Sequence, residues 1–212
     1  MTGLRQAQKE RTRQALLDAA LRLLEHQSLS TLGIREVTRE VGMAPAAFYR
    51  HFGDIEELGV ALVEQSFESL RFAFDDLGVA QADSDLLMRQ AVDVLAGHVR
   101  RHAAHFRFLA RERYGGLAVV RRAIHEQLRW FADRLSGELA ARPGMERWDP
   151  GDVRMLAELI VNHLISAATA ILEAEQDPPS EQRAVYTAYL QLRLISVGRS
   201  HWTDQPQSDR SL

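Results

Sequence analysis

Donor-bearing side chains follow a run of small residues near the amino-terminal end of the sequence. Tyr49, Arg50 and His51 carry hydrogen-bonding tips that suit phosphate oxygens, and they come shortly after Ala46 and Ala47. Small side chains let a helix approach the edges of base pairs closely. This combination indicates an element that reads duplex DNA. The predicted contacts are Ala44, Pro45, Ala46, Ala47 and Tyr49 towards the groove, Arg35, Arg50 and His51 on phosphates, and Arg5 and Lys9 at an adjacent minor groove.

The stretch 34–52 predicts two short helices around a glycine, which is the outline of a helix-turn-helix. Gly42 can take the positive φ that ends the first helix. Pro45 fits the first turn of the second helix, where a missing N–H costs nothing. Val37 and Phe48 supply apolar contacts between the two helices. The alternative interpretation is an ordinary helical hairpin with solvated charges.

The apolar residues recur with helical spacing along almost the whole sequence, so we expect an all-α protein. The first helix should bury Leu16, Ala20, Leu23 and Leu24 at spacings of three and four. Residues 1–53 are predicted to form a DNA-binding domain, residues 54–199 a ligand-binding and dimerisation domain, and residues 200–212 a disordered tail. The expected helices cover about 4–26, 34–41, 45–52, 54–74, 85–102, 104–111, 116–140, 151–173 and 180–197.

Composition is ordinary for a soluble globular chain of 212 residues, with 46% hydrophobic and 26% charged residues. The net charge is -3, but residues 1–52 hold eight Lys or Arg against five Asp or Glu. A basic amino-terminal segment before an acidic remainder fits a modular DNA-binding protein. The absence of cysteine excludes thiolate nucleophiles and cysteine-bound zinc. No signal peptide or long apolar run is evident, and a cytoplasmic location is expected.

The sequence resembles that of TetR-family transcriptional regulators. The resemblance rests on residues 16–20, 34–42 and 49–52, each of which falls where the family pattern places it. At Ile55 many members carry a phosphate-contacting lysine, which this chain lacks. The resemblance implies a TetR-like fold, with a three-helix DNA-binding head and a helical body that senses a ligand and dimerises.

Segments 52–59, 106–113 and 190–196 are similar to the DesT and FabR branch of that family. Members of this branch repress unsaturated fatty-acid synthesis genes and sense long-chain acyl-CoA. The resemblance therefore implies a repressor that controls fatty-acid desaturation in response to acyl-CoA. A TetR-type repressor for another hydrophobic or amphipathic molecule is the alternative. The expected mechanism is a ligand-driven shift of the long helix beginning at Asp54, which changes the separation of two DNA-reading helices.

Apolar residues in the body could line a cavity for an acyl chain, as the resemblance implies. Without the resemblance, the same residues would more ordinarily fill a solid core. Seven arginines between residues 100 and 122 could supply cations for the phosphates of a thioester ligand, although solvated helix faces look the same. The predicted lining is Leu95, Val99, Phe106, Leu109, Leu117, Val120, Ile124, Leu128, Phe131, Ile160 and Leu164.

One DNA-reading head makes too few contacts for operator specificity, so the mechanism needs a homodimer on a palindromic operator. Its two reading helices would then lie about 34–36 Å apart. The last two helices of each protomer can form a four-helix interface. The alternative is that they only complete the protomer core. The predicted interface residues are Leu159, Asn162, His163, Ser166, Ala170, Tyr189, Leu192 and Ile195.

Metal binding and catalysis receive little support from the residues. His98, His102 and His105 share one helix face, but no carboxylate joins them at matching spacing, so no metal or cofactor is expected. No serine-hydrolase elbow, zinc-protease helix or phosphate-binding glycine loop occurs, and an enzyme is not expected. A sequence-nonspecific architectural DNA binder remains a competing interpretation, and it would bind any duplex with similar affinity.

Overall fold

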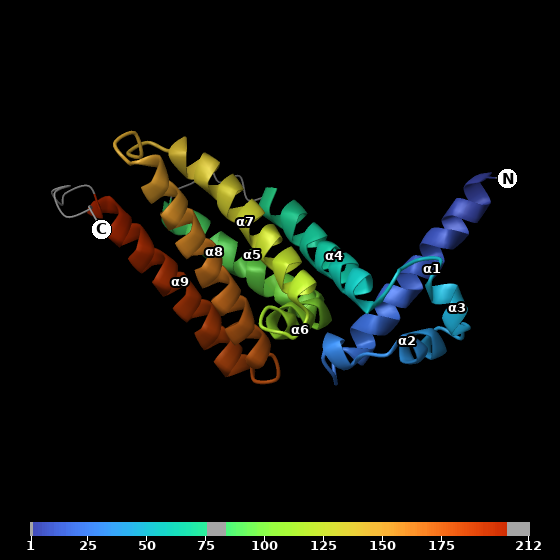
Figure 1. The fold of residues 1–212 in the computed structure, drawn as a ribbon. Helices are drawn as coiled ribbons and strands as arrows, with labels where there is room; N and C mark the ends of the chain where they lie inside the picture. Colours follow the sequence, from blue (N-terminus) through green and yellow to red (C-terminus); the bar gives the residue numbers. More distant parts are fainter. Residues whose placement is uncertain (1, 76–83, 203–212) are drawn as a thin grey trace. The chain divides into compact units, whose positions relative to one another are not determined.

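The computed structural model describes residues 2–75 and 84–202, which fold into helices joined by turns without any β-strand (Figure 1). The prediction of an all-α protein is confirmed. The elements are α1 (Thr2–Leu23), a 3-10 turn η1 (Leu29–Thr31), α2 (Ile34–Glu40), α3 (Pro45–Phe48), α4 (Ile55–Asp75), α5 (Ser84–Arg101), α6 (Ala103–Glu112), α7 (Ala118–Ala140), α8 (Pro150–Glu173) and α9 (Pro178–Ser200).

The described residues form two compact units. The amino-terminal unit comprises residues 2–70 together with 102–127, and the carboxyl-terminal unit comprises residues 71–75, 84–101 and 128–202. The first unit therefore holds α6 and the first part of α7 in addition to the head. The predicted boundary after residue 53 separates DNA binding from ligand binding and dimerisation, and it does not divide the chain into compact units. It stays a prediction.

In the amino-terminal unit, α1 packs against α2 and α6. Leu16, Ala20 and Leu24 are buried as predicted, whereas Leu23 is only half-buried. Phe48, the last residue of α3, and Phe52, four residues further on, are also buried. The helical hairpin is thus fixed to α1 through a shared apolar core.

Local capping defines where α2 and α4 begin. The backbone N–H of Gly33 donates to Glu36 Oε2 at 3.0 Å, which is one half of a capping box. At the start of α4, the backbone N–H of Glu57 donates to Asp54 Oδ1 at 2.8 Å, and the N–H of Gly53 donates to Glu57 Oε2 at 2.6 Å. Both helix starts are therefore encoded locally.

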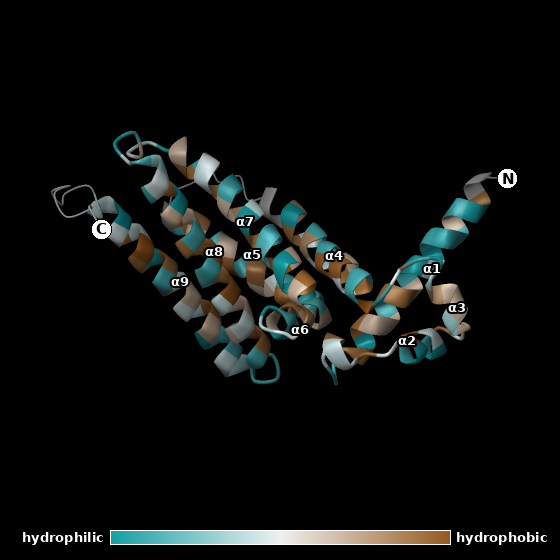
Figure 2. Ribbon diagram, in the orientation of Figure 1, coloured by the Kyte–Doolittle hydropathy of each residue, from teal (hydrophilic) through white to brown (hydrophobic). Residues whose placement is uncertain are grey.

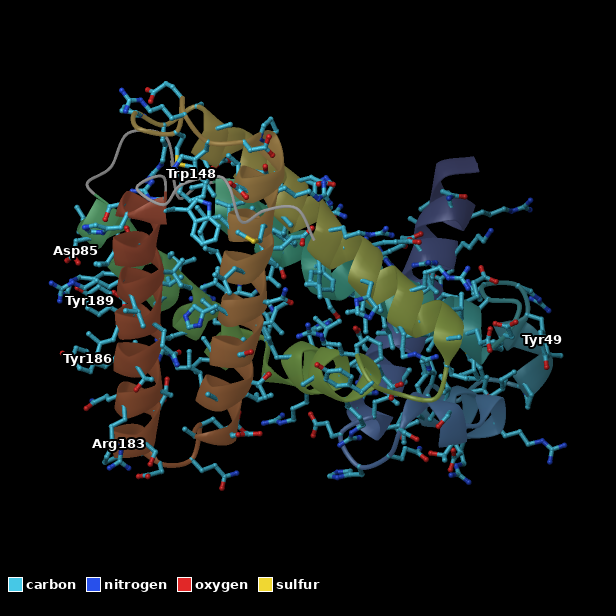
Figure 3. The ribbon with its side chains drawn as sticks, turned by 60° about the vertical axis from the view of Figure 1, so that its left-hand side comes forward. Tyr49, Asp85, Trp148, Arg183, Tyr186 and Tyr189 are labelled. Carbon is cyan, nitrogen blue, oxygen red and sulfur yellow. The ribbon has the colours of Figure 1, made fainter. Side chains whose placement is uncertain are left out.

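In the carboxyl-terminal unit, α5, α8 and α9 pack around a buried cluster that includes Val92, Ala167 and Leu192. Tyr189 of α9 also belongs to this cluster, and its hydroxyl donates to Asp85 at 2.6 Å (Figure 3). The hydrogen bonds from Tyr189 and Arg89 lower the pKa of the Asp85 carboxyl. Polar contacts thus tie the start of α5 to α9 beside the apolar cluster.

Helix α8 is the most apolar element of the unit, as the run of brown residues along it indicates (Figure 2). By length and composition, it is the one helix in the described part of the chain that could cross a membrane. A core helix passes the same test, and α8 buries Val153, Leu156 and Ile171 among other residues within the unit. Part of its apolar surface packs against α5 and α9, and part, which includes Met155 and Leu159, is exposed.

The carboxyl-terminal end of α9 is held by aromatic packing. The rings of Trp148 and Trp202 stack with centroids 6.1 Å apart, and Trp202 Nε1 donates to Asp152 at 3.0 Å. Of the predicted disordered tail, Ser200 ends α9 and Trp202 makes these contacts. Residues 203–212 lie outside the described part of the chain.

Candidate nucleic-acid interface

The turn between α2 and α3 has the predicted geometry. Gly42 adopts a φ of +69°, a conformation that glycine takes without strain. The backbone N–H of Met43 donates to the carbonyl of Thr38 at 2.8 Å and closes the turn. Pro45 occupies the first turn of α3, and Phe48 is fully buried. The turn chemistry and one buried ring orient the short second helix.

The outer face of α3 is slim and exposed. Ala44, Pro45 and Ala46 are exposed and Ala47 is half-buried. Tyr49 follows the helix with 61% of its surface exposed (Figure 3). These properties fit the groove-facing surface that the sequence predicts.

Basic side chains from α1 and from the end of α3 gather around His51. Burial, together with the positive charges of Lys9, Arg13 and Arg50, lowers the pKa of the His51 imidazole. The guanidinium of Arg13 lies 4.8 Å from the centre of the Phe52 ring. Lys9 of α1 is 41 residues from Arg50 in the sequence, and Arg50 and His51 directly follow α3. The three side chains nevertheless share one electropositive region.

Arg13 belongs to this region although the sequence-based contacts do not include it. Arg5, Lys9 and Arg13 recur every four residues, so one face of α1 carries all three. That spacing could have identified Arg13 from the sequence. Arg5 and Arg35 are exposed, as a contact with DNA requires, but no described interaction joins them to the other basic residues.

The first part of the chain matches a known family. Residues 16–62 fit the family described as bacterial regulatory proteins, tetR family. These residues form a TetR-type amino-terminal domain. The match covers the end of α1, the helix-turn-helix and the start of α4. It includes Arg50 and His51, whereas Lys9 and Arg13 lie on α1 just before it.

Solved structures with the TetR-type fold extend the likeness to most of the chain. The fatty acid degradation regulator FadR from Bacillus halodurans is 14% identical over 85% of this chain and 93% of its own, with a TM-score of 0.68. FadR from Bacillus subtilis, solved with stearoyl-CoA, is 16% identical over 87% and 98%, with a TM-score of 0.69. The multidrug binding protein EbrR, solved with imidazole, is 20% identical over 85% and 93%, with a TM-score of 0.59. At these identities, the likeness shows the fold alone.

The predicted ligand-lining residues are divided between the two units. Phe106, Leu109, Leu117, Val120 and Ile124 belong to the amino-terminal unit, and Leu95, Val99, Leu128, Phe131, Ile160 and Leu164 to the carboxyl-terminal unit. Within the latter, Leu95, Ile160 and Leu164 pack against the buried cluster of α5, α8 and α9. These three side chains therefore contribute to the protomer core, and a ligand cavity stays a prediction.

Several arginines near the predicted lining have partners within the protein. Arg111 Nη1 donates to the carbonyls of Leu24 and Gln27, and Arg121 Nη1 donates to the carbonyl of Gly115. Arg100 forms an ion pair with Glu181. These guanidiniums act as structural donors, which weakens their interpretation as phosphate ligands.

The predicted interface residues fall into two groups on α8 and α9. Leu159, Asn162, Ser166 and Ala170 of α8 are exposed along one face. In contrast, Tyr189 and Leu192 are 95% buried in the protomer's own core, Ile195 packs against that core, and His163 Nε2 hydrogen-bonds to the carbonyl of Ala188 at 3.0 Å. The assignment of Tyr189 and Leu192 to an intersubunit surface is corrected accordingly.

The exposed apolar face of α9 lies elsewhere on the helix and was missed. Tyr186, Leu190, Leu194 and Val197 are exposed, with Leu194 at 72%. Figure 3 shows Tyr186 on the outer side of α9. Their spacings of four, four and three residues place them on one helix face. This spacing was visible in the sequence, but α9 carries a second apolar stripe that obscured it.

Of the three histidines named in the sequence analysis, His102 and His105 are neighbours, with ring centroids 6.2 Å apart. His98 is buried in the carboxyl-terminal unit. In the amino-terminal unit, His105 Nδ1 and Ser66 Oγ hydrogen-bond at 2.8 Å, and burial lowers the pKa of the His105 imidazole. Among the residues that the structure describes, no three His, Cys, Asp or Glu side chains are grouped to hold a metal.

Proposed function

We propose that this protein is a DNA-binding transcriptional repressor of TetR type that acts as a homodimer on a palindromic operator in the cytoplasm. One observation carries the proposal. Arg50 and His51 lie at the end of the helix-turn-helix, inside the TetR-type match, and Lys9 and Arg13 of α1 lie close to His51. Cations at this place suit phosphates on either side of a groove, while the small residues let the helix approach base edges. The proposed role is regulatory and not enzymatic.

Tyr49 provides the sharpest test of DNA binding. Its side chain is exposed beyond the end of α3, so the Tyr49→Ala change should leave the fold intact. We expect the operator dissociation constant to rise about tenfold or more, because removing one DNA-facing side chain from each of two heads costs about 1–3 kcal/mol. The measurement is an electrophoretic titration of a palindromic operator selected from genomic fragments.

Tyr114→Ala is the matched control, because Tyr114 is 80% exposed but lies between α6 and α7, outside the reading element. It should bind the operator like wild type. If Tyr49→Ala and Tyr114→Ala had equal dissociation constants for the operator, Tyr49 would not be part of the DNA interface. Similar wild-type affinity for the operator and for an unrelated duplex of the same length would instead indicate a nonspecific architectural protein.

The homodimer is proposed to form through α8 and α9. Both helices carry exposed apolar residues on one face, which include Leu159 on α8 and Leu194 on α9. A two-fold axis would bring the same two faces of each protomer together as a four-helix interface. The proposed interface comprises Met155, Leu159, Asn162, Ser166 and Ala170 of α8 with Tyr186, Leu190, Leu194 and Val197 of α9.

The proposed effector is a long-chain acyl-CoA, and the proposed targets are genes of fatty-acid desaturation and unsaturated fatty-acid synthesis. Support comes from the fold-level likeness to two FadR proteins, one of them solved with stearoyl-CoA. The likeness to the multidrug binding protein EbrR supports the alternative, a repressor that responds to another hydrophobic molecule. Either effector would act by binding more tightly to the dimer conformation with one distance between its two DNA-reading helices than to the conformation with the other distance.

Adding stearoyl-CoA tests the effector. A ligand that binds only the folded state at 100 times its dissociation constant stabilises that state by about 2.7 kcal/mol, so the melting temperature should rise by several degrees. Free coenzyme A and stearate serve as controls for the two halves of the molecule. No rise with stearoyl-CoA, together with a rise for an unrelated hydrophobic compound, would favour the alternative effector.

A further inference from the structure

A buried carboxylate joins α6 to the connection between α1 and α2. Glu112 is the last residue of α6, and only 1% of its surface is exposed. Its Oε1 accepts a hydrogen bond from the backbone N–H of Leu29 at 2.9 Å. Leu29 begins η1, so this N–H has no partner within the turn itself. Glu112 Oε2 is also buried and has no hydrogen-bond partner among the described residues, so the bond at Oε1 is the polar contact that anchors this side chain.

The preceding residue holds the other end of the same connection. Arg111 Nη1 donates to the carbonyls of Leu24 at 2.7 Å and Gln27 at 2.5 Å, just after α1 ends. Carbonyls at a helix end lack intrahelical donors, and a cation there also suits the helix dipole. Arg107, one turn earlier on α6, lies 3.9 Å from Glu25. Consecutive residues of α6 thus fix both the exit from α1 and the start of η1.

The side chain of Leu29 anchors η1 to a second helix, α4. It is fully buried and packs against α4 at Gly59, where a side chain would overlap Leu29 Cδ2. Val120 of α7 lies against the same glycine. Because Glu112 of α6 binds the backbone of Leu29 and α4 packs against its side chain, η1 connects the helix-turn-helix with α4 and α6.

We infer that Arg111 and Glu112 are positioning residues: together they clamp the α1–α2 connection to α6 and so set the orientation of the DNA-reading head. Phe106 and Leu109, two of the predicted ligand-lining residues, lie on the same helix within six residues of the clamp. A displacement of α6 at these residues would reach the head through Arg111 and Glu112. This regulatory role rests on the proposed function, whereas the mechanical role of the clamp does not.

Hydrogen exchange of the free protein tests the clamp without DNA or effector. In E112A, the Leu29 amide loses its acceptor, and its exchange should accelerate about tenfold or more, because a buried N–H without an acceptor opens to solvent more readily. In R111A, amides of residues 24–29 should exchange several times faster. E112Q keeps an acceptor oxygen and should stay near the wild-type rate. If the amides of residues 24–29 exchanged at the wild-type rate in both E112A and R111A, the proposed clamp would be wrong.

E126A and R122A are matched controls, because both residues are exposed on α7 in the same unit. In both variants, the amides of residues 24–29 should exchange at the wild-type rate. If E112A does not fold, R111A keeps the test decisive, since Arg111 is itself exposed and its removal leaves no cavity. R122A removes the same charge as R111A. It therefore separates a loss of positioning from a loss of general attraction to DNA.

Operator binding then tests the regulatory role. R111A should weaken operator binding several-fold relative to R122A, and the change in affinity on adding stearoyl-CoA should be smaller in R111A than in wild type. Wild-type affinity and a wild-type response to stearoyl-CoA in R111A would overturn this role. A wild-type protein that bound no duplex would overturn the proposed function, while the exchange rates would still decide the clamp.

Discussion

Replacing Leu194 by arginine is expected to convert the proposed homodimer into monomers and to abolish operator binding at concentrations that saturate wild type. Leu194 is 72% exposed on α9, so the arginine can be solvated in the free protomer and should not unfold it. In the proposed interface, two-fold symmetry would bury the new charge twice. An unpaired buried charge costs about 3–5 kcal/mol, which is enough to separate most dimers at micromolar concentration.

Sedimentation of the Leu194→Arg variant measures its oligomeric state, and its circular dichroism spectrum confirms that the helices persist. Leu86→Arg is a suitable control, because Leu86 is also exposed, at 51%, but lies near the start of α5. The control should sediment like wild type. An intact Leu194→Arg dimer would show that α9 presents another face to its partner. Leu192→Arg would not answer this question, since Leu192 belongs to the protomer core.

Replacing Gly59 by alanine is expected to destabilise the protein by about 1–3 kcal/mol, although alanine is the better helix former by about 1 kcal/mol. A Cβ at this position would overlap Leu29 Cδ2 and lie 2.9 Å from Val120 Cγ2. Both of these side chains are fully buried, so they can move only by displacing the residues packed around them. The steric cost should therefore exceed the gain in helix propensity.

Gly137→Ala provides the opposite expectation in the same background. Gly137 lies inside α7 and is exposed, and a Cβ added there would meet no atom within 4 Å, so alanine should raise stability by up to about 1 kcal/mol. Thermal and urea denaturation of the two variants and wild type gives the comparison. An increase in stability for Gly59→Ala would mean that α4, α7 and η1 are less tightly packed than the structure indicates.

The helix-turn-helix could be predicted from sequence because local chemistry specifies it. Gly42 ends one helix, Pro45 starts the next, and Phe48 fixes their packing, all within seven residues. The same holds for the start of α4, which Asp54 and Glu57 cap. These features depend on neighbours in the chain and not on the tertiary fold.

The roles of α9 and of Glu112 could not be predicted in this way. Apolar residues occupy more than one side of α9, and only its packing against α5 and α8 shows that Leu192 faces inward and Leu194 outward. Glu112 looked like one more charge in a polar segment. Its partner, Leu29, is 83 residues away, so its burial follows from the tertiary fold alone.

All three tryptophans of the chain, Trp130, Trp148 and Trp202, belong to the carboxyl-terminal unit, where Trp148 and Trp202 stack on each other. The amino-terminal unit, with the DNA-reading head, has no indole among its described residues. Intrinsic indole emission is therefore a signal from one unit. Far-ultraviolet ellipticity comes from helices of both, so comparing the two signals during denaturation reports directly on whether the units melt together.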